Sequence, residues 1–211
     1  MNAKAKTGLA CVCLGVALLI GALGLYQSNR REALEAEAAS REIIAQMAET
    51  ITEERTQGVP SPVEMPAELP LTEEPVLDTA MTAMEIDGYR YVGFLTIPDL
   101  ALELPVMEEW DYDRLKIAPC RYSGTLLGGD LVIAAHNYLS HFGHLMELAI
   151  GSKILFTDVN GNLTRYSVAE LEILQPTAVE DMTAGDYDLT LFTCTYGGAT
   201  RFTVRCIREN G

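Results

Sequence analysis

Nineteen consecutive uncharged residues, 8–26 (GLACVCLGVALLIGALGLY), limit most strongly how this chain can fold. At a rise of about 1.5 Å per residue, a helix of this length nearly matches a hydrocarbon core of roughly 30 Å. The alternative is a cleaved signal peptide, because Lys4 and Lys6 precede the apolar run. The apolar region of a signal peptide is usually only about 7–15 residues long, so we expect a membrane anchor over residues 1–28.

The orientation of this anchor does not follow from its flanking charges. Lys4 and Lys6 precede the apolar segment, and Arg30 and Arg31 follow it, so the balance of basic residues alone does not decide. Only a short leader precedes the segment. We therefore expect a single-pass protein in the cell membrane, with its N-terminus inside and everything after the anchor outside the cytoplasm.

The chain has a net charge of −15, and both parts that follow the anchor are acidic. Residues 27–87 carry 4 Arg against 14 Asp and Glu, and residues 88–211 carry 9 Lys and Arg against 16 acids. Nucleic-acid phosphates need clusters of Lys and Arg, so this composition argues against a nucleic-acid partner. It also keeps the exported part away from an anionic membrane surface.

Three further regions follow the anchor. Residues 29–57 are rich in Ala, Glu and Arg and lack Pro and Gly, which predicts an acidic stalk helix. Its thin apolar stripe is typical of a solvated stalk, and a coiled-coil contact with a second copy is the alternative. Residues 58–88 carry five prolines among acids and predict a linker that holds the next region away from the bilayer. Residues 89–211 are long enough for one hydrophobic core.

This last region predicts an all-β domain, because short apolar runs alternate with turn residues. Asn160-Gly161 predicts a type I′ hairpin turn, in which both central residues have positive φ. Short helical turns are expected around 112–116 and 142–150. The expected strands are 89–97, 102–106, 131–135, 154–156, 164–174, 189–193 and 201–207.

Outside the apolar segment the chain has three cysteines, Cys120, Cys194 and Cys206, so at least one thiol is free or pairs with another chain. A Cys120–Cys206 disulfide is one possibility, and two free or buried thiols are the other. Cys194 ends an apolar run and precedes a turn containing two glycines, which indicates a strand end facing a loop. A cysteine after such a run is usually a small core residue, but a strand end is also where a reactive group can meet a substrate.

A nucleophilic thiol needs a proton acceptor, since the thiolate is the form that attacks. His136 also follows an apolar run, 131–135, and is our candidate general acid and base. His141 and His144 lie on the following loop, where we expect solvated or capping roles. The three histidines could instead hold a metal, but no Asp or Cys nearby completes such a cluster, so we predict no metal and no cofactor.

A cation is the third element expected of such a site. Arg201 opens the last strand and returns beside Cys194 if residues 196–200 form a hairpin loop. A guanidinium there could bind a substrate carbonyl and stabilise an oxyanion. Arg205 shares the same strand face if that strand is regular, but its distance from Cys194 makes it the weaker candidate.

These residues resemble the sortase family. The run Thr190-Leu191-Phe192-Thr193-Cys194 resembles the sortase signature TLxTC, and an arginine and a histidine stand where the family has them, at Arg201 and His136. The stretch 136–145 is most similar to class B sortases. Ala135 departs from the Gly that often precedes the family's histidine, at the cost of one methyl group.

The resemblance, which covers residues 89–211, implies an eight-stranded β-barrel with short helices and a membrane-anchored cysteine transpeptidase. Cys194 would form a thioester with an LPxTG-like C-terminal sorting signal, His136 would transfer protons, and Arg201 would hold substrate and oxyanion. An amine of a peptidoglycan precursor or a pilin would resolve the thioester. Thr193, Asn137 and Tyr196 are the further candidates for substrate binding.

Two other functions remain compatible with the sequence. A cysteine peptidase would use water in place of the amine, because the acylation step is the same. A catalytically silent, anchored β module would bind peptide or wall material and keep Cys194 for packing.

Overall fold

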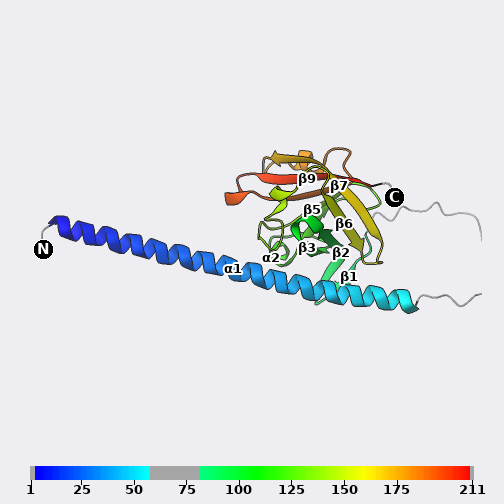
Figure 1. Ribbon diagram of the computed structural model, residues 1–211, viewed down its shortest axis with the longest axis horizontal. Coiled ribbons are helices and arrows are strands. Elements are labelled where there is room, and N and C mark those ends of the chain that lie inside the picture. The colour runs from blue at the N-terminus through cyan, green and yellow to red at the C-terminus, as the bar shows by residue number, and fades with distance from the viewer. Residues whose placement is uncertain (1–2, 58–80, 210–211) are drawn as a thin grey trace, which may run out of the picture.

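The computed structural model describes residues 3–57 and 81–209 and contains one long helix and a β-barrel (Figure 1). The elements in chain order are α1 (Ala3–Gln57), β1 (Met84–Ile86), β2 (Tyr89–Ile97), η1 (Pro98–Leu100), β3 (Leu102–Met107), α2 (Arg114–Ile117), β4 (Cys120–Ser123), β5 (Leu131–Ala134), η2 (Leu145–Glu147), β6 (Lys153–Asp158), β7 (Leu163–Leu174), α3 (Val179–Thr183), β8 (Leu189–Cys194), η3 (Tyr196–Gly198) and β9 (Arg201–Arg208). Most of the predicted linker, 58–80, lies outside the described residues.

Eight strands close into a barrel in the order β2-β3-β4-β5-β8-β9-β7-β6, and β6 pairs again with β2. The barrel is mixed, because the β3–β4 and β5–β8 pairs are parallel while the other pairs in this ring are antiparallel. The predicted eight-stranded fold is confirmed. A ninth strand, β1, extends the sheet outside the ring by pairing with the first residues of β2.

The apolar runs of the sequence supply the barrel core. β5 and the first three residues of β8 are buried on both faces, which explains why β5 is apolar throughout and why Thr190 is the only polar residue in that part of β8. Aromatic side chains fill the interior between the strands, and Phe142, Phe156 and Tyr166 are fully buried there. Burial of such side chains contributes roughly 1.5–3 kcal/mol each.

Two strands of the structure were not predicted from the sequence. β1 lies at 84–86, inside the segment predicted as linker, so the linker is shorter than predicted at its C-terminal end. β4 lies at 120–123 and carries Arg and Ser beside its apolar residues. Both strands alternate apolar and polar residues, but they are only three and four residues long, which is too short for the alternation to stand out in the sequence.

The hairpin at Asn160-Gly161 is present, but its predicted type I′ turn is wrong. Gly161 has φ +77°, whereas Asn160 is not among the residues with positive φ. The Asp158 carboxylate accepts hydrogen bonds from the backbone N–H groups of Asn160 and Asn162, at 2.9 and 2.8 Å. This pattern fits a three-residue hairpin loop in which only the last residue, Gly161, has the left-handed conformation. The Asp158 carboxylate stabilises the turn that precedes Gly161.

Helix α1 is continuous through the predicted anchor and stalk. Its N-terminal half projects away from the barrel, and its C-terminal half runs alongside it (Figure 1). In the described part of the chain, this is the one helix long and apolar enough to cross a membrane, and its most apolar segment contains no buried residue.

The expectation of a solvated stalk is wrong for one side of this helix. Ala36, Ser40, Ile43 and Met47 recur every three or four residues and are buried against the barrel. Ile43 and Met47 belong to a core cluster with Ile86, Tyr91 and Met107 of β1, β2 and β3. The sequence could not reveal this partner, because the receiving surface is assembled from strands distant in the chain.

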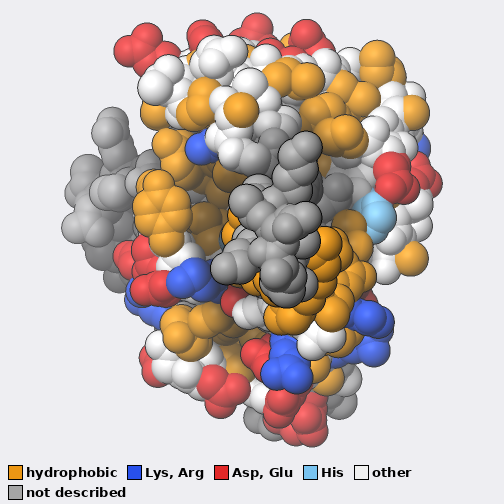
Figure 2. Space-filling view, turned by 90° about the vertical axis from the view of Figure 1, so that its left-hand side faces the viewer, with side chains coloured by type: hydrophobic (Ala, Val, Ile, Leu, Met, Phe, Trp, Pro, Cys, Tyr) orange, Lys and Arg blue, Asp and Glu red, His pale blue; other side chains and the backbone are white. Residues whose placement is uncertain are grey.

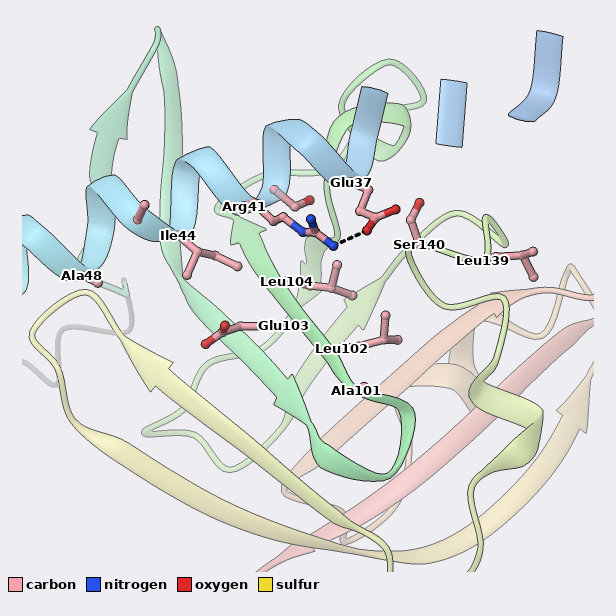
Figure 3. Close-up of a pocket in the computed structure, with 12 residues that line it drawn as sticks. Glu37, Arg41, Ile44, Ala48, Ala101, Leu102, Glu103, Leu104, Leu139 and Ser140 are labelled. Atoms are coloured by element: carbon pink, nitrogen blue, oxygen red, sulfur yellow. Dashed lines mark hydrogen bonds and ion pairs between the residues drawn. The ribbon is translucent and has the colours of Figure 1, made fainter. Parts of the chain in front are cut away.

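The contact leaves an open groove of about 670 Å³ between α1 and β3. Figure 3 shows Ile44 and Leu104 facing this groove from opposite sides, with the Glu37–Arg41 ion pair at its edge. That pair spans 2.5 Å and lies on the solvent side, so its contribution to stability is small.

We expect Met47→Ala to lower the free energy of unfolding by about 2–4 kcal/mol, because the buried thioether side chain leaves a cavity between α1 and the barrel. Glu49→Ala, on the exposed side of the same helix, should change it by less than about 0.5 kcal/mol. Denaturant unfolding of the full chain measures both. Equal effects of the two substitutions would contradict the packed interface.

Candidate active site

The parallel pairing of β5 and β8 brings the two strand ends together. Ala134 pairs with Phe192, and His136 and Cys194 each lie two residues beyond this pair. The Ala135 N–H donates to the Phe192 carbonyl at 3.2 Å, and the Thr193 hydroxyl donates to the Ala135 carbonyl at 2.9 Å. The strands therefore stay joined up to the last residue before His136 and Cys194.

Antiparallel pairing places Arg201 next to Cys194. The two residues are direct partners in the β8–β9 register, so their side chains lie on the same face of the sheet. The Arg201 guanidinium donates to the carbonyls of Gly198 and Thr200, at 3.2 and 3.1 Å. The loop before β9 thus holds the cation beside the partly buried thiol.

The ring of His136 is held on two sides. Its Nδ1 atom lies 3.0 Å from Asn137 Oδ1, and because an amide oxygen only accepts, Nδ1 donates and Nε2 is left for proton transfer. The ring of Tyr138 stacks on it with a centroid distance of 3.9 Å and an interplanar angle of 14°. Burial lowers the pKa of His136, and the contact with Asn137 and the negative charge of Glu32 oppose that shift.

A groove of about 170 Å³ runs past Cys194 and Arg201. Its aromatic wall was not predicted from the sequence: Trp110 packs on Tyr122 with ring centroids 5.2 Å apart, and Tyr122 packs on Phe192 at 5.2 Å. Hydrophobic side chains are prominent on the face turned toward the N-terminal end of α1 (Figure 2). β8 ends and β9 begins on this side of the barrel (Figure 1).

Arg205, the weaker candidate cation, does not line this groove. Its side chain is 4% exposed and pairs with Glu172 at 2.6 Å. It donates to the Thr190 hydroxyl at 3.1 Å and to the carbonyls of Asp181 and Met182 in α3. Arg205 therefore fixes α3, which supplies Met182 to the groove.

The other two histidines have different surroundings. His141 is completely buried, so the expected solvated or capping role is wrong for it, and burial lowers its pKa to about 4. Its neighbour is Tyr138, at a ring-centroid distance of 5.6 Å. His144 lies at the N-cap position of η2 but its side chain makes no capping hydrogen bond; it is exposed and contacts Glu147 at 2.5 Å, which fits the solvated alternative.

The three predicted substrate-binding residues differ in their placement. Thr193 borders the groove, but its hydroxyl donor is engaged by Ala135. Asn137 contacts His136. Tyr196 begins η3, and its side chain lies outside the described part of the structure. A substrate contact by any of them stays a prediction.

The cysteines of the barrel are all free, so the possible Cys120–Cys206 disulfide is not formed. Cys120 and Cys206 are fully buried, and burial raises the pKa of each thiol to about 12. Cys194 is only partly buried and lines the groove.

The sortase domain family matches residues 95–209, more than half of the sequence. The chain belongs to the sortase family, and it is therefore a cysteine transpeptidase. No curated protein matches it.

Solved structures share the fold. Sortase C of Streptococcus pneumoniae aligns with a TM-score of 0.58 and 21% identity over 81% of this chain and 97% of that one. A Clostridium perfringens sortase D5 transpeptidase aligns with a TM-score of 0.58 and 16% identity over 82% and 99%. Sortase C1 of Streptococcus suis is 26% identical over 57% and 74%, with a TM-score of 0.51. These are class C and D enzymes, so the finer resemblance to class B is not supported.

Alkylation of the folded chain should distinguish the three barrel thiols. At about pH 8, iodoacetamide should modify Cys194, whereas Cys120 and Cys206 should react only after denaturation, because a raised pKa and burial leave almost no accessible thiolate. Peptide mass mapping reads this out. Protection of Cys194 in the folded chain would favour a packing role.

Arg205→Leu should lower the free energy of unfolding by about 3–5 kcal/mol, because Glu172 and the α3 carbonyls lose a buried partner. The matched control is Arg165→Leu, which removes an exposed arginine of β7 and should cost less than about 0.5 kcal/mol. Denaturant unfolding compares the two. A small effect of Arg205→Leu would contradict the role of Arg205 in holding α3 against the barrel.

Proposed function

We propose that Cys194 is the nucleophile, His136 the general acid and base, and Arg201 the cation that holds substrate and oxyanion. The observation that carries this proposal is the register of β5, β8 and β9, which sets the three residues at adjoining strand ends. Rigid strands hold reacting groups more precisely than loops do. The partly buried thiol and the groove beside it support the same assignment.

In the first half-reaction, the Cys194 thiolate attacks a peptide carbonyl and forms a tetrahedral oxyanion. Arg201 stabilises that negative charge from the same face of the sheet. When the C–N bond breaks, protonated His136 gives its proton to the departing amine, and a thioester remains on Cys194. In the second half-reaction, an incoming amine loses a proton to His136 and attacks the thioester, which returns the thiolate.

The substrate we propose is an LPxTG-like C-terminal sorting signal, with an amine of the cell wall or of a pilin as acceptor. The aromatic wall formed by Trp110, Tyr122 and Phe192 supports an apolar peptide segment, because flat rings contact aliphatic and proline side chains well. The family membership supports a sorting signal as the substrate class.

We further propose that residues 8–26 anchor the chain in the cell membrane, with the barrel outside the cytoplasm. Tyr138, beside His136, contacts Glu32, which follows the apolar segment by six residues, or about 9 Å of helix. The site then faces the bilayer rather than being held away from it by the linker, because the barrel lies back along α1 (Figure 1). A peptide leaving the membrane would meet the groove directly.

The full chain in detergent or nanodiscs should ligate an LPxTG-like peptide to a glycine oligomer. Cys194→Ala should abolish ligation, and His136→Ala should lower it by about 10²–10⁴-fold through loss of proton transfer. Arg201→Ala should cost somewhat less than His136→Ala. His144→Ala, which removes an exposed histidine of the same loop, should retain the rate of the unmodified chain. Ligated and hydrolysed peptides are separated by mass spectrometry.

Hydrolysis alone, despite abundant amine, would contradict the proposed transfer and favour a peptidase. Full ligation by Cys194→Ala in a folded chain would refute the assigned nucleophile.

A further inference from the structure

Helix α1 contacts the segment that carries His136. The Tyr138 hydroxyl donates to the Glu32 carboxylate at 2.9 Å, and the Ser140 hydroxyl donates to the Ala33 carbonyl at 2.9 Å. These bonds join residues more than one hundred positions apart in the sequence. The membrane-proximal turn of α1 therefore has two polar contacts with a single short loop.

Tyr138 links this contact to the imidazole. Its ring lies nearly parallel to the ring of His136, at a centroid distance of 3.9 Å, and the residue is 5% exposed. The backbone around it is also fixed, because the Tyr138 carbonyl accepts from the N–H groups of His141 and Gly143, each at 2.9 Å. Because the two rings are stacked, movement of the Tyr138 ring would displace the ring of His136.

Burial and the neighbouring carboxylate raise the pKa of Tyr138 to about 12, so its hydroxyl keeps the proton that it donates. His136 meets charges from several elements: Glu32 of α1 raises its pKa, Lys116 of α2 lowers it, and His141 lies on its own loop. The negative charge of Glu32 thus favours the imidazolium that protonates the leaving amine.

We propose that Tyr138 is a positioning residue for His136 and that Glu32 of α1 holds Tyr138 in place, so that the membrane-proximal helix forms part of the catalytic apparatus. This inference rests on the proposed role of His136 as acid and base. Neither Tyr138 nor Glu32 lines the groove beside Cys194. Their loss should consequently change kcat more than KM.

The test uses the full chain in nanodiscs. Tyr138→Phe keeps the stacked ring and loses the donor, while Glu32→Ala loses the acceptor. Each should lower kcat by about three- to tenfold, as expected for one hydrogen bond, with little change in KM. The double variant should be no slower than Glu32→Ala alone, because that substitution already removes the hydrogen bond of Tyr138. Glu42→Ala, at an exposed position of the same helix, is the matched control and should keep the unmodified rate.

Glu32→Gln separates charge from hydrogen bonding. It keeps an acceptor for Tyr138 and should retain most of kcat, but it removes a negative charge that stabilises the imidazolium, so the pKa of His136 should fall. Titration of the histidine ring signals by NMR measures this, and His136→Gln identifies the signal among three histidines. Glu42→Gln should leave that pKa unchanged.

Unchanged kcat in Tyr138→Phe and Glu32→Ala would overturn the inference, as would fully additive losses in the double variant. An unmoved pKa of His136 in Glu32→Gln would contradict the electrostatic contact. Failure of the proposed function looks different: the unmodified chain would not ligate, or His136→Ala would remain fully active, whereas the NMR titration would still report the electrostatic effect of Glu32 on His136.

Discussion

The parallel pairing of β5 with β8 is the constraint on which the proposed site depends. It fixes Ala134 opposite Phe192, so the residue two positions beyond each strand partner, His136 or Cys194, emerges at the same edge of the barrel. The Thr193–Ala135 hydrogen bond extends this pairing to the last residue before the site. β9 then adds Arg201 from the other side of β8. A slip by one residue would turn the thiol to the opposite face of the sheet.

The second constraint is the long helix, which links the barrel to the apolar segment. Ile43 and Met47 bury one side of α1 against the barrel, while Tyr138 and Ser140 bind the turn of α1 at Glu32 and Ala33. This packing fixes the orientation of the barrel, and of the groove beside Cys194, relative to α1. The polar contacts join the loop that carries His136 to the same helix. The interface between α1 and the barrel therefore determines how the site is placed relative to the helix.

The sequence revealed the features that arise locally. Largely apolar runs located β5 and β8, the turn after Cys194 marked a strand end, and the TLxTC resemblance implied the eight-stranded barrel. It did not reveal contacts between distant segments. The apolar stripe that includes Ile43 and Met47 was expected to face solvent, with a second copy as the alternative, and no sequence pattern linked Glu32 to Tyr138. Trp110 and Tyr122 meet only after the strands close the groove, so their chemistry was invisible in spacing alone.

The most direct test of the account is to locate the covalent intermediate. The full chain would be incubated briefly with an LPxTG-like peptide in the absence of amine, quenched with acid, digested and analysed by mass spectrometry. If Cys194 is the nucleophile, the peptide fragment that contains it gains the mass of the substrate's acyl portion. An acyl group on Cys120 or Cys206, or cleavage of the peptide with no acyl group on any cysteine, would contradict it.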